Sequence, residues 1–348
     1  MASSSSSSSA PEHHFDAHIT LRPSQQALRP SPAETLALHA ENRARLVAAL
    51  RADGSGAQPP RHRGVVLLAG GEAETRHETD HEKLFRQESF FHWAFGVREP
   101  DWLGALSLET GEATLFMPRL PEAYAIVMGR IRPPAEFREL YGVESVRFID
   151  ELPEVLAALC GGASPAPAPG FGKAGGESQA PPGALLLLKG FNTDGRAYAR
   201  PASFAGIERF GTDTGRLWPA MTELRAVKTA REVRMLRYSA AITSEGHIAV
   251  MQHVAHALGA GAGAGAPLFE YQLESLFHHW CYYFGGCRHL SYTCICAAGH
   301  NGSVLHYGHA GEPNAHRVSA DQMCLFDMGA EFVGTHSEPL RRAPGPTS

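Results

Sequence analysis

One carboxylate stands inside an apolar segment, and it is the first residue whose chemistry needs explaining. Asp327 lies in the run Met323-Cys324-Leu325-Phe326-Asp327-Met328. A charge in such a segment is costly unless it is paired or bound to a metal ion. Asp327 is therefore either a metal ligand or a buried carboxyl that is hydrogen-bonded to backbone or protonated. The pattern alone favours the second interpretation.

Other residues before this segment could also do chemistry. His306 could hydrogen-bond a substrate carboxylate or a developing oxyanion, although a lone histidine is more often a core residue. Tyr292 is more readily interpreted as a residue that lines a pocket than as a catalytic residue. Cys294 and Cys296 could join His306 and His309 as soft ligands of Zn²⁺, but their spacing is not that of a standard zinc finger. Because residues i and i+2 of a strand share a face, we expect both cysteines to be core thiols.

Two helices and three strands are predicted to position these residues. Thr229-Ala230-Arg231-Glu232 forms a capping box, and apolar residues recur at helical spacing from there to Leu258. A second helix is predicted over 268–284, with His278 and His279 facing solvent or a partner domain, and Gly285-Gly286 ends it. The strands are predicted over 292–298, 303–307 and 323–328. Helices followed by strands, after a separate α/β unit, indicate an α+β fold class.

The first half of the chain carries its own set of elements. A helix is predicted over 34–52 from its leucine and alanine content. Short apolar or aromatic runs predict strands over 65–68, 90–95, 103–108, 113–117 and 185–188, with a turn at Thr110-Gly111. The boundary to the second half is predicted near Leu217-Trp218-Pro219.

Two segments have biased composition. Residues 3–9 are all serine, no apolar region follows that would make a secretory signal, and we expect a disordered tail. Residues 161–183 are dominated by Gly, Ala, Pro and Ser, so they cannot bury enough apolar surface to order themselves. We expect a flexible insertion there, because a strand pattern resumes directly afterwards.

Composition narrows the class of protein. Hydrophobic residues make up 43% and charged residues 19% of the chain, which is typical of a globular protein. The net charge of -5 gives no electrostatic reason to expect nucleic acid or an anionic membrane as a partner. Six cysteines without a secretory signal favour a reducing, cytoplasmic location.

Several ordered blocks of sequence resemble the eukaryotic prolidases, which are Xaa-Pro dipeptidases of the pita-bread metallopeptidase family. The resemblance runs from about residue 30 to residue 332. In the first half it rests on Leu84-Phe85-Arg86-Gln87-Glu88-Ser89-Phe90-Phe91-His92-Trp93-Ala94-Phe95-Gly96-Val97 and on Leu115-Phe116-Met117-Pro118-Arg119-Leu120-Pro121. In the second half it rests on four further blocks, which are Glu274-Ser275-Leu276-Phe277, Ser291-Tyr292-Thr293-Cys294-Ile295-Cys296, Val304-Leu305-His306-Tyr307-Gly308-His309-Ala310-Gly311 and Met323-Cys324-Leu325-Phe326-Asp327-Met328-Gly329.

The resemblance implies a creatinase/aminopeptidase-P-like N-terminal α/β domain over 30–217, followed by an incomplete pita-bread catalytic domain over 218–332. Residues 1–29 would be the serine-rich tail and 333–348 a divergent tail. It further implies a homodimer that splits dipeptides with C-terminal proline or hydroxyproline. The chemistry would depend on two bridged Mn²⁺ ions held by two Asp, one His and two Glu.

Only part of that site carries over residue by residue. Asp327 matches the first metal-binding Asp, His306 matches a histidine beside the substrate, and Tyr292 matches a tyrosine next to the site. The second metal-binding Asp is expected about a dozen residues past Asp327. That place reads Val333-Gly334-Thr335-His336-Ser337-Glu338-Pro339-Leu340, and no Asp follows Asp327. The remaining ligands would lie beyond Ser348, so a frameshift, intron read-through or alternative splice end is indicated.

Three functions are compatible with this pattern. The first is a manganese-dependent Xaa-Pro dipeptidase, inactive as this truncated chain because one carboxylate cannot hold two divalent ions against water. The second is a non-catalytic protein of the same descent, whose N-terminal domain dimerises with a full-length prolidase. The third is a chain without stable function, because half a pita-bread domain leaves sheet edges and apolar surface unpaired.

Overall fold

The computed structural model describes residues 26–52, 64–161, 183–193, 195–259, 267–308 and 314–332, with the backbone of 335–336 and 340–343. The serine run and nearly all of the insertion over 161–183 lie outside the described residues. The chain forms two compact units. The N-terminal unit consists mainly of Pro30–Leu236, and the C-terminal unit consists mainly of Arg237–Phe332. Each is described by itself.

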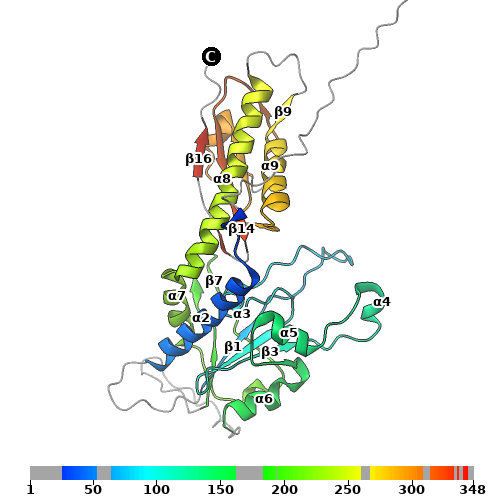
Figure 1. The fold of residues 1–348 in the computed structure, drawn as a ribbon, viewed down its shortest axis with the longest axis vertical. Coiled ribbons are helices and arrows are strands. Elements are labelled where there is room, and N and C mark those ends of the chain that lie inside the picture. Colours follow the sequence, from blue (N-terminus) through cyan, green and yellow to red (C-terminus); the bar gives the residue numbers. More distant parts are fainter. Residues whose placement is uncertain are drawn as a thin grey trace, which may run out of the picture. The chain divides into compact units, whose positions relative to one another are not determined.

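A six-stranded mixed sheet forms the centre of the N-terminal unit, in the order β4-β3-β2-β1-β5-β8 (Figure 1). Strand β1 pairs antiparallel with β2 and parallel with β5, and β3 pairs parallel with β4. The expected strands over 65–68, 103–108, 113–117 and 185–188 are confirmed. The bounds are β1 Val65–Ala69, β2 Leu103–Ser107, β3 Ala113–Met117, β4 Ser145–Phe148, β5 Leu185–Leu187 and β8 Thr212–Asp213.

Both faces of this sheet are covered by apolar side chains. Alternate residues of a strand point to opposite faces, and accordingly Val66 and Leu68 lie in one buried cluster while Val65 and Leu67 lie in another. Helix α6 covers the Val65 face, and four other helices cover the Val66 face (Figure 1). Their bounds are α2 Pro32–Arg51, α3 Ser89–Phe95, α5 Pro134–Tyr141, α6 Leu152–Leu159 and α7 Leu217–Ala226.

The strand predicted over 90–95 is wrong, because this segment is helix α3. Its aromatic residues favour strands, but capping decides the outcome. Glu88 accepts a hydrogen bond from the Phe91 backbone N–H at 2.7 Å, which caps the first turn. Gly96 ends the helix in the left-handed conformation, with φ +69°.

The capping box predicted at Thr229 is confirmed, and it starts the long helix α8 (Ala230–Leu258). The Glu232 carboxylate accepts from the Thr229 backbone N–H at 2.7 Å, and the Thr229 hydroxyl accepts from the Glu232 N–H at 3.2 Å. The two units divide within this helix, between Leu236 and Arg237, whereas Leu217 is buried in the N-terminal core. The sequence boundary near Leu217 stays a prediction.

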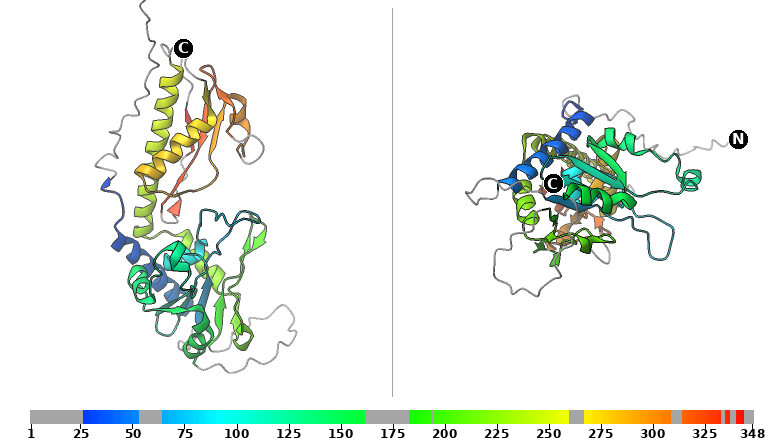
Figure 2. Two further views of the ribbon diagram at one scale, coloured as in Figure 1. Left: turned by 90° about the vertical axis from the view of Figure 1, so that its right-hand side faces the viewer. Right: turned by 90° about the horizontal axis from the view of Figure 1, so that it is seen from below.

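The C-terminal unit places α8 and α9 (Glu270–His279) against short strands (Figure 2). The second helix is shorter than predicted, since Leu268–Phe269 is strand β9 and Trp280–Phe284 is a π-helical turn. The strands form the orders β10-β14-β15, β11-β13-β16 and β12-β9. Their bounds are β10 His289–Leu290, β11 Ile295–Ala298, β12 Arg317–Val318, β13 Cys324–Asp327, β14 Ala330–Phe332, β15 Thr335–His336 and β16 Leu340–Ala343.

Polar side chains of α8 fasten the strand backbone beside Asp327. Ser239, Thr243 and His247 recur every four residues on one helix face, and all three are fully buried. Ser239 Oγ donates to the Ala330 carbonyl at 2.7 Å, and Thr243 Oγ1 accepts from the Ala330 N–H at 3.0 Å. His247 Nε2 lies 2.9 Å from the carbonyl oxygen of Met328. The helix thereby holds the chain that follows β13.

Candidate functional site

Asp327 is the last residue of β13, the central strand of its sheet. Strand β11 pairs with it on one side and β16 on the other, which puts Ile295 and Leu340 opposite Asp327. The carboxylate is half-buried and accepts a hydrogen bond from the Tyr292 hydroxyl at 2.6 Å. The structure thus brings together two of the three predicted site residues.

His306 lies on an exposed turn rather than on the strand predicted over 303–307. Residues Gly299–Ser303 form a short 3₁₀ helix, and 305–308 form a turn. The strand prediction failed because Gly302 and Gly308 flank only a few apolar residues, too few to form a strand. The turn presents His306 to solvent, while its neighbour Tyr307 is fastened inward.

The fastening residue is Glu270, a fully buried carboxylate at the start of α9. Its Oε1 accepts from the Ala298 N–H at 2.7 Å, and its Oε2 accepts from the Tyr307 hydroxyl at 2.6 Å and the His316 N–H at 3.0 Å. Burial and the bond to Glu270 raise the pKa of Tyr307. Glu270 therefore fixes strand β11 and the turn of His306 together.

A second buried residue, Asn314, bonds to the backbone of Cys294, just before β11, and of Cys296, on β11. Asn314 Nδ2 donates to the Cys294 carbonyl at 3.0 Å, and Asn314 Oδ1 accepts from the Cys296 N–H at 2.9 Å. The same Nδ2 also donates to Glu274 Oε2 at 2.8 Å. Cys294 and Cys296 are buried, as predicted, with 1% and 0% of their surface exposed.

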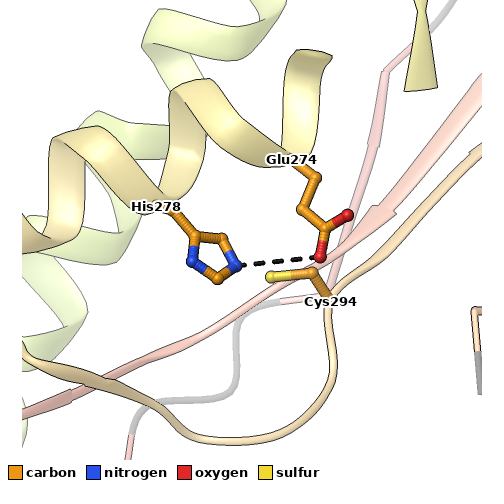
Figure 3. A group of neighbouring side chains, drawn as sticks. All are labelled: Glu274, His278 and Cys294. Carbon is orange, nitrogen blue, oxygen red and sulfur yellow. Dashed lines mark ion pairs between the residues drawn. The ribbon is translucent and has the colours of Figure 1, made fainter. Parts of the chain in front are cut away.

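Cys294 also belongs to a group of ligand-type side chains (Figure 3). Glu274 and His278 lie one helical turn apart on α9, with Glu274 Oε1 3.7 Å from His278 Nε2. The ligand atoms of Glu274, His278 and Cys294 all lie within 4.8 Å of one another. His278 holds the pKa of Glu274 below its ordinary value, and burial raises the pKa of the Cys294 thiol.

This group differs from the zinc group considered from the sequence. Within the described part of the chain, Cys294 shares a potential metal-binding group with Glu274 and His278, and neither Cys296 nor His306 is a member. His309 lies outside the described residues. His278 and His279 are both exposed, as predicted.

Two family models match the chain. Residues 39–166 match the aminopeptidase P N-terminal domain, and residues 234–342 match metallopeptidase family M24. The chain belongs to the pita-bread metallopeptidases of family M24. Aspartate on the central strand of the second match fits a metallopeptidase, since carboxylates are preferred ligands of hard divalent ions.

Curated relatives that the chain resembles include Xaa-Pro dipeptidases. It is 44% identical over 298 residues to the Xaa-Pro dipeptidases of Homo sapiens and Pongo abelii, covering 85% of this chain and 53% of theirs. It is 42% identical to that of Mus musculus, over 90% of this chain and 56% of the relative. The chain therefore spans about half the length of the curated relatives it matches.

Solved structures support the fold. Aminopeptidase P from E. coli with the inhibitor Pro-Leu aligns over 91% of this chain and 63% of its own, with a TM-score of 0.62 and 20% identity. Aminopeptidase PepP of Pseudomonas aeruginosa aligns over the same shares, with a TM-score of 0.63 and 20% identity. The expected aminopeptidase-P-like domain followed by M24 catalytic-domain sequence is confirmed.

An M24 protein binds divalent metal, but the described residues do not fit a bridged pair of ions. Such a pair needs several carboxylate or imidazole ligands converging on one point. The residues paired with Asp327 on the neighbouring strands are Ile295 and Leu340, and neither residue type offers a ligand atom. Its remaining polar contact described here is the Tyr292 hydroxyl. In the described residues, these contacts bring no carboxylate or imidazole to Asp327.

Proposed function

We propose that this chain derives from a manganese-dependent Xaa-Pro dipeptidase that hydrolyses dipeptides with C-terminal proline or hydroxyproline. The observation that carries the proposal is the 42–44% identity to Xaa-Pro dipeptidases over 85–90% of the chain. The Tyr292–Asp327 hydrogen bond supports it, because the sequence resemblance matches both residues to the same site.

Each of the three site residues has a proposed role. Asp327 is a metal ligand, and the bond from Tyr292 orients its carboxylate. His306, on a turn anchored through Tyr307 and Glu270, reaches the carboxylate of a bound dipeptide. Mn²⁺ suits such a site because it prefers hard oxygen ligands together with some imidazole.

We further propose that the 348-residue polypeptide does not hydrolyse Xaa-Pro dipeptides by itself. One carboxylate cannot hold two divalent ions against water. Leu340 is paired with Asp327 on the neighbouring strand, where a carboxylate could act as a second metal ligand. Glu331, which is 6% exposed and lies on β14 opposite His289 of β10, could serve as a substitute ligand together with His336 and Glu338. The side chains of His336 and Glu338 lie outside the described residues.

A cytoplasmic location and a homodimer complete the proposal. The six cysteines are free thiols, five of them buried, which suits a reducing compartment. No helix in the described ranges is long and apolar enough to cross a membrane.

The alternative function is that of a non-catalytic partner of a full-length prolidase. The N-terminal unit favours it, because apolar side chains cover both faces of its sheet.

A chimera tests the proposed descent. Residues 1–332 would be joined to the part of the human Xaa-Pro dipeptidase that follows its matching segment, and Gly-Pro hydrolysis would be measured with Mn²⁺. We expect activity that is lost in Asp327→Ala and kept in Asp321→Asn, an exposed carboxylate of the same unit. A folded chimera whose activity survives Asp327→Ala would contradict the assignment of Asp327.

A further inference from the structure

The group of Glu274, His278 and Cys294 has a donor set different from that of the Asp327 site. It offers one carboxylate, one imidazole and one thiol, whose ligand atoms all lie within 4.8 Å of one another. A thiolate and an imidazole are preferred by Zn²⁺, whereas Mn²⁺ prefers carboxylate and water. The donor set therefore selects a softer ion than a prolidase site would hold.

The geometry suits one tetrahedral ion. Glu274 and His278 are four residues apart on α9, so they share a helix face, and Cys294 approaches from the segment before β11 (Figure 3). The Glu274 Oε1–His278 Nε2 distance is 3.7 Å. Two ligands at about 2.1 Å from a tetrahedral ion are separated by about 3.4 Å. For this pair of ligands, only a small side-chain adjustment is needed to bind one ion.

The group is also held in place by a residue outside it. Asn314, 1% exposed, donates from Nδ2 both to Glu274 Oε2 and to the backbone carbonyl of Cys294. This leaves Glu274 Oε1 directed at His278. Metal ligands are commonly oriented by such outer hydrogen bonds. The site is open on one side, because half of the His278 side-chain surface is exposed.

We propose that Glu274, His278 and Cys294 form a mononuclear site for Zn²⁺ or a similar thiophilic divalent cation, with water as the fourth ligand. The cation enters from the exposed His278 side and rests against the buried Cys294 sulfur. Asn314 is a positioning residue. The site is separate in composition from the Mn²⁺ site assigned to Asp327, and it does not depend on the proposed dipeptidase activity.

Cobalt substitution tests the site on the full 348-residue chain. Co²⁺ bound to a thiolate gives a sulfur-to-metal charge-transfer band in the near ultraviolet, and Zn²⁺ displaces it. We expect one Co²⁺ per chain with this band, its loss in Cys294→Ser, and its retention in Cys296→Ser. Cys296 is the matched control because it is equally buried and only two residues away.

A histidine pair supplies a variant that leaves the core intact. Asn314→Ala removes a residue that orients a ligand, and it is expected to weaken Zn²⁺ binding roughly tenfold. His278→Gln, at an exposed position, removes a ligand itself, so it is expected to weaken Zn²⁺ binding by at least as much. His279→Gln is the control, because His279 is also exposed and stacks on Tyr283 at 5.2 Å. A chain that gives no charge-transfer band, a band that survives Cys294→Ser, or unchanged Zn²⁺ affinity in His278→Gln would overturn the proposal.

Discussion

The two units of this chain are stabilised in different ways. In the N-terminal unit, apolar side chains such as Leu68 on one face and Phe116 on the other fill both faces of a six-stranded sheet. In the C-terminal unit, buried polar side chains bond directly to strand backbone, as Glu270 does to Ala298 and Ser239 does to Ala330. Apolar packing tolerates small shifts of position, whereas these hydrogen bonds fix the backbone at particular atoms.

This difference follows what each unit has to position. The N-terminal unit contains no predicted site residue. The C-terminal unit carries Tyr292, His306 and Asp327, each of which depends on the placement of a strand end or a turn. The buried polar contacts of Glu270 and Asn314 supply that placement at the expense of desolvated polar groups.

The largest expected effect of a single substitution is a loss of packing in the N-terminal unit. Phe116 is fully buried between sheet and α6, so Phe116→Ala is expected to lower the free energy of unfolding of this unit by about 4 kcal/mol. Hydrogen exchange followed by mass spectrometry would show lost protection in β1–β3. Leu84→Ala, at an exposed leucine of the same unit, is the control and should change stability little. Equal costs at both positions would contradict the apolar-core description.

Acidic pH should also destabilise the N-terminal unit. Burial lowers the pKa of His39 to about 4 and that of His92 to about 3, and the His39 ring, 5.3 Å from that of His92, adds to the lowering at His92. Above pH 6.5 both histidines are neutral in the folded and in the unfolded chain, so they do not lower the free energy of unfolding there. As pH falls from 6.5 toward 4, these histidines take up protons in the unfolded chain but not in the folded unit. The free energy of unfolding is therefore expected to fall by about 3 kcal/mol for each histidine.

The measurement is the free energy of unfolding between pH 7 and pH 4. His92→Gln is expected to flatten that dependence, and His279→Gln, at an exposed histidine, is expected to leave it unchanged. A pH dependence that is the same in wild type and His92→Gln would show that the buried histidines do not set it.

In the C-terminal unit, Glu270→Gln should cost roughly 2 kcal/mol. The amide nitrogen of glutamine would face donors at Tyr307 and His316 that need an acceptor, leaving buried groups unsatisfied. Faster hydrogen exchange in β11 and in the turn of His306 would report this. Asp321→Asn is the control, and exchange that is equal in both variants would break the contrast between the units.

The smallest effect is expected at the Tyr292–Asp327 bond. Tyr292→Phe removes one hydrogen bond at the edge of the core and should lower stability by about 1 kcal/mol. Tyr283→Phe, at an exposed tyrosine, should have no measurable effect. A Tyr292→Phe variant as stable as wild type would mean that the bond orients Asp327 without stabilising the fold.

The sequence predicted the elements with strong local signals. The capping box at Thr229 and the apolar runs of β1, β2 and β3 depend on neighbouring residues, so each could be recognised locally. The segment 90–95 is a helix and not the predicted strand, because the capping signals of Glu88 and Gly96 outweigh its aromatic content. Local composition alone does not decide between helix and strand in so short a segment.

The site was predictable only in part, for the same physical reason. Asp327 and Tyr292 were found through a family motif, but Glu270 and Asn314 bond to groups 18–46 residues away in sequence. The Glu274–His278 pair has a visible helical spacing, whereas its approach to Cys294 depends on how α9 and β11 pack. Contacts of this kind arise from tertiary structure and leave no periodic signal.

Gly-Pro hydrolysis by the purified 348-residue chain, with Mn²⁺ supplied and Asp327→Ala measured in parallel, tests the central claim most directly. The claim is that this M24 chain carries one ligand position of a dinuclear site, and it predicts no hydrolysis by either protein. Hydrolysis by the wild-type chain that disappears in Asp327→Ala would contradict it, and would show that other residues of these 348 complete the metal site.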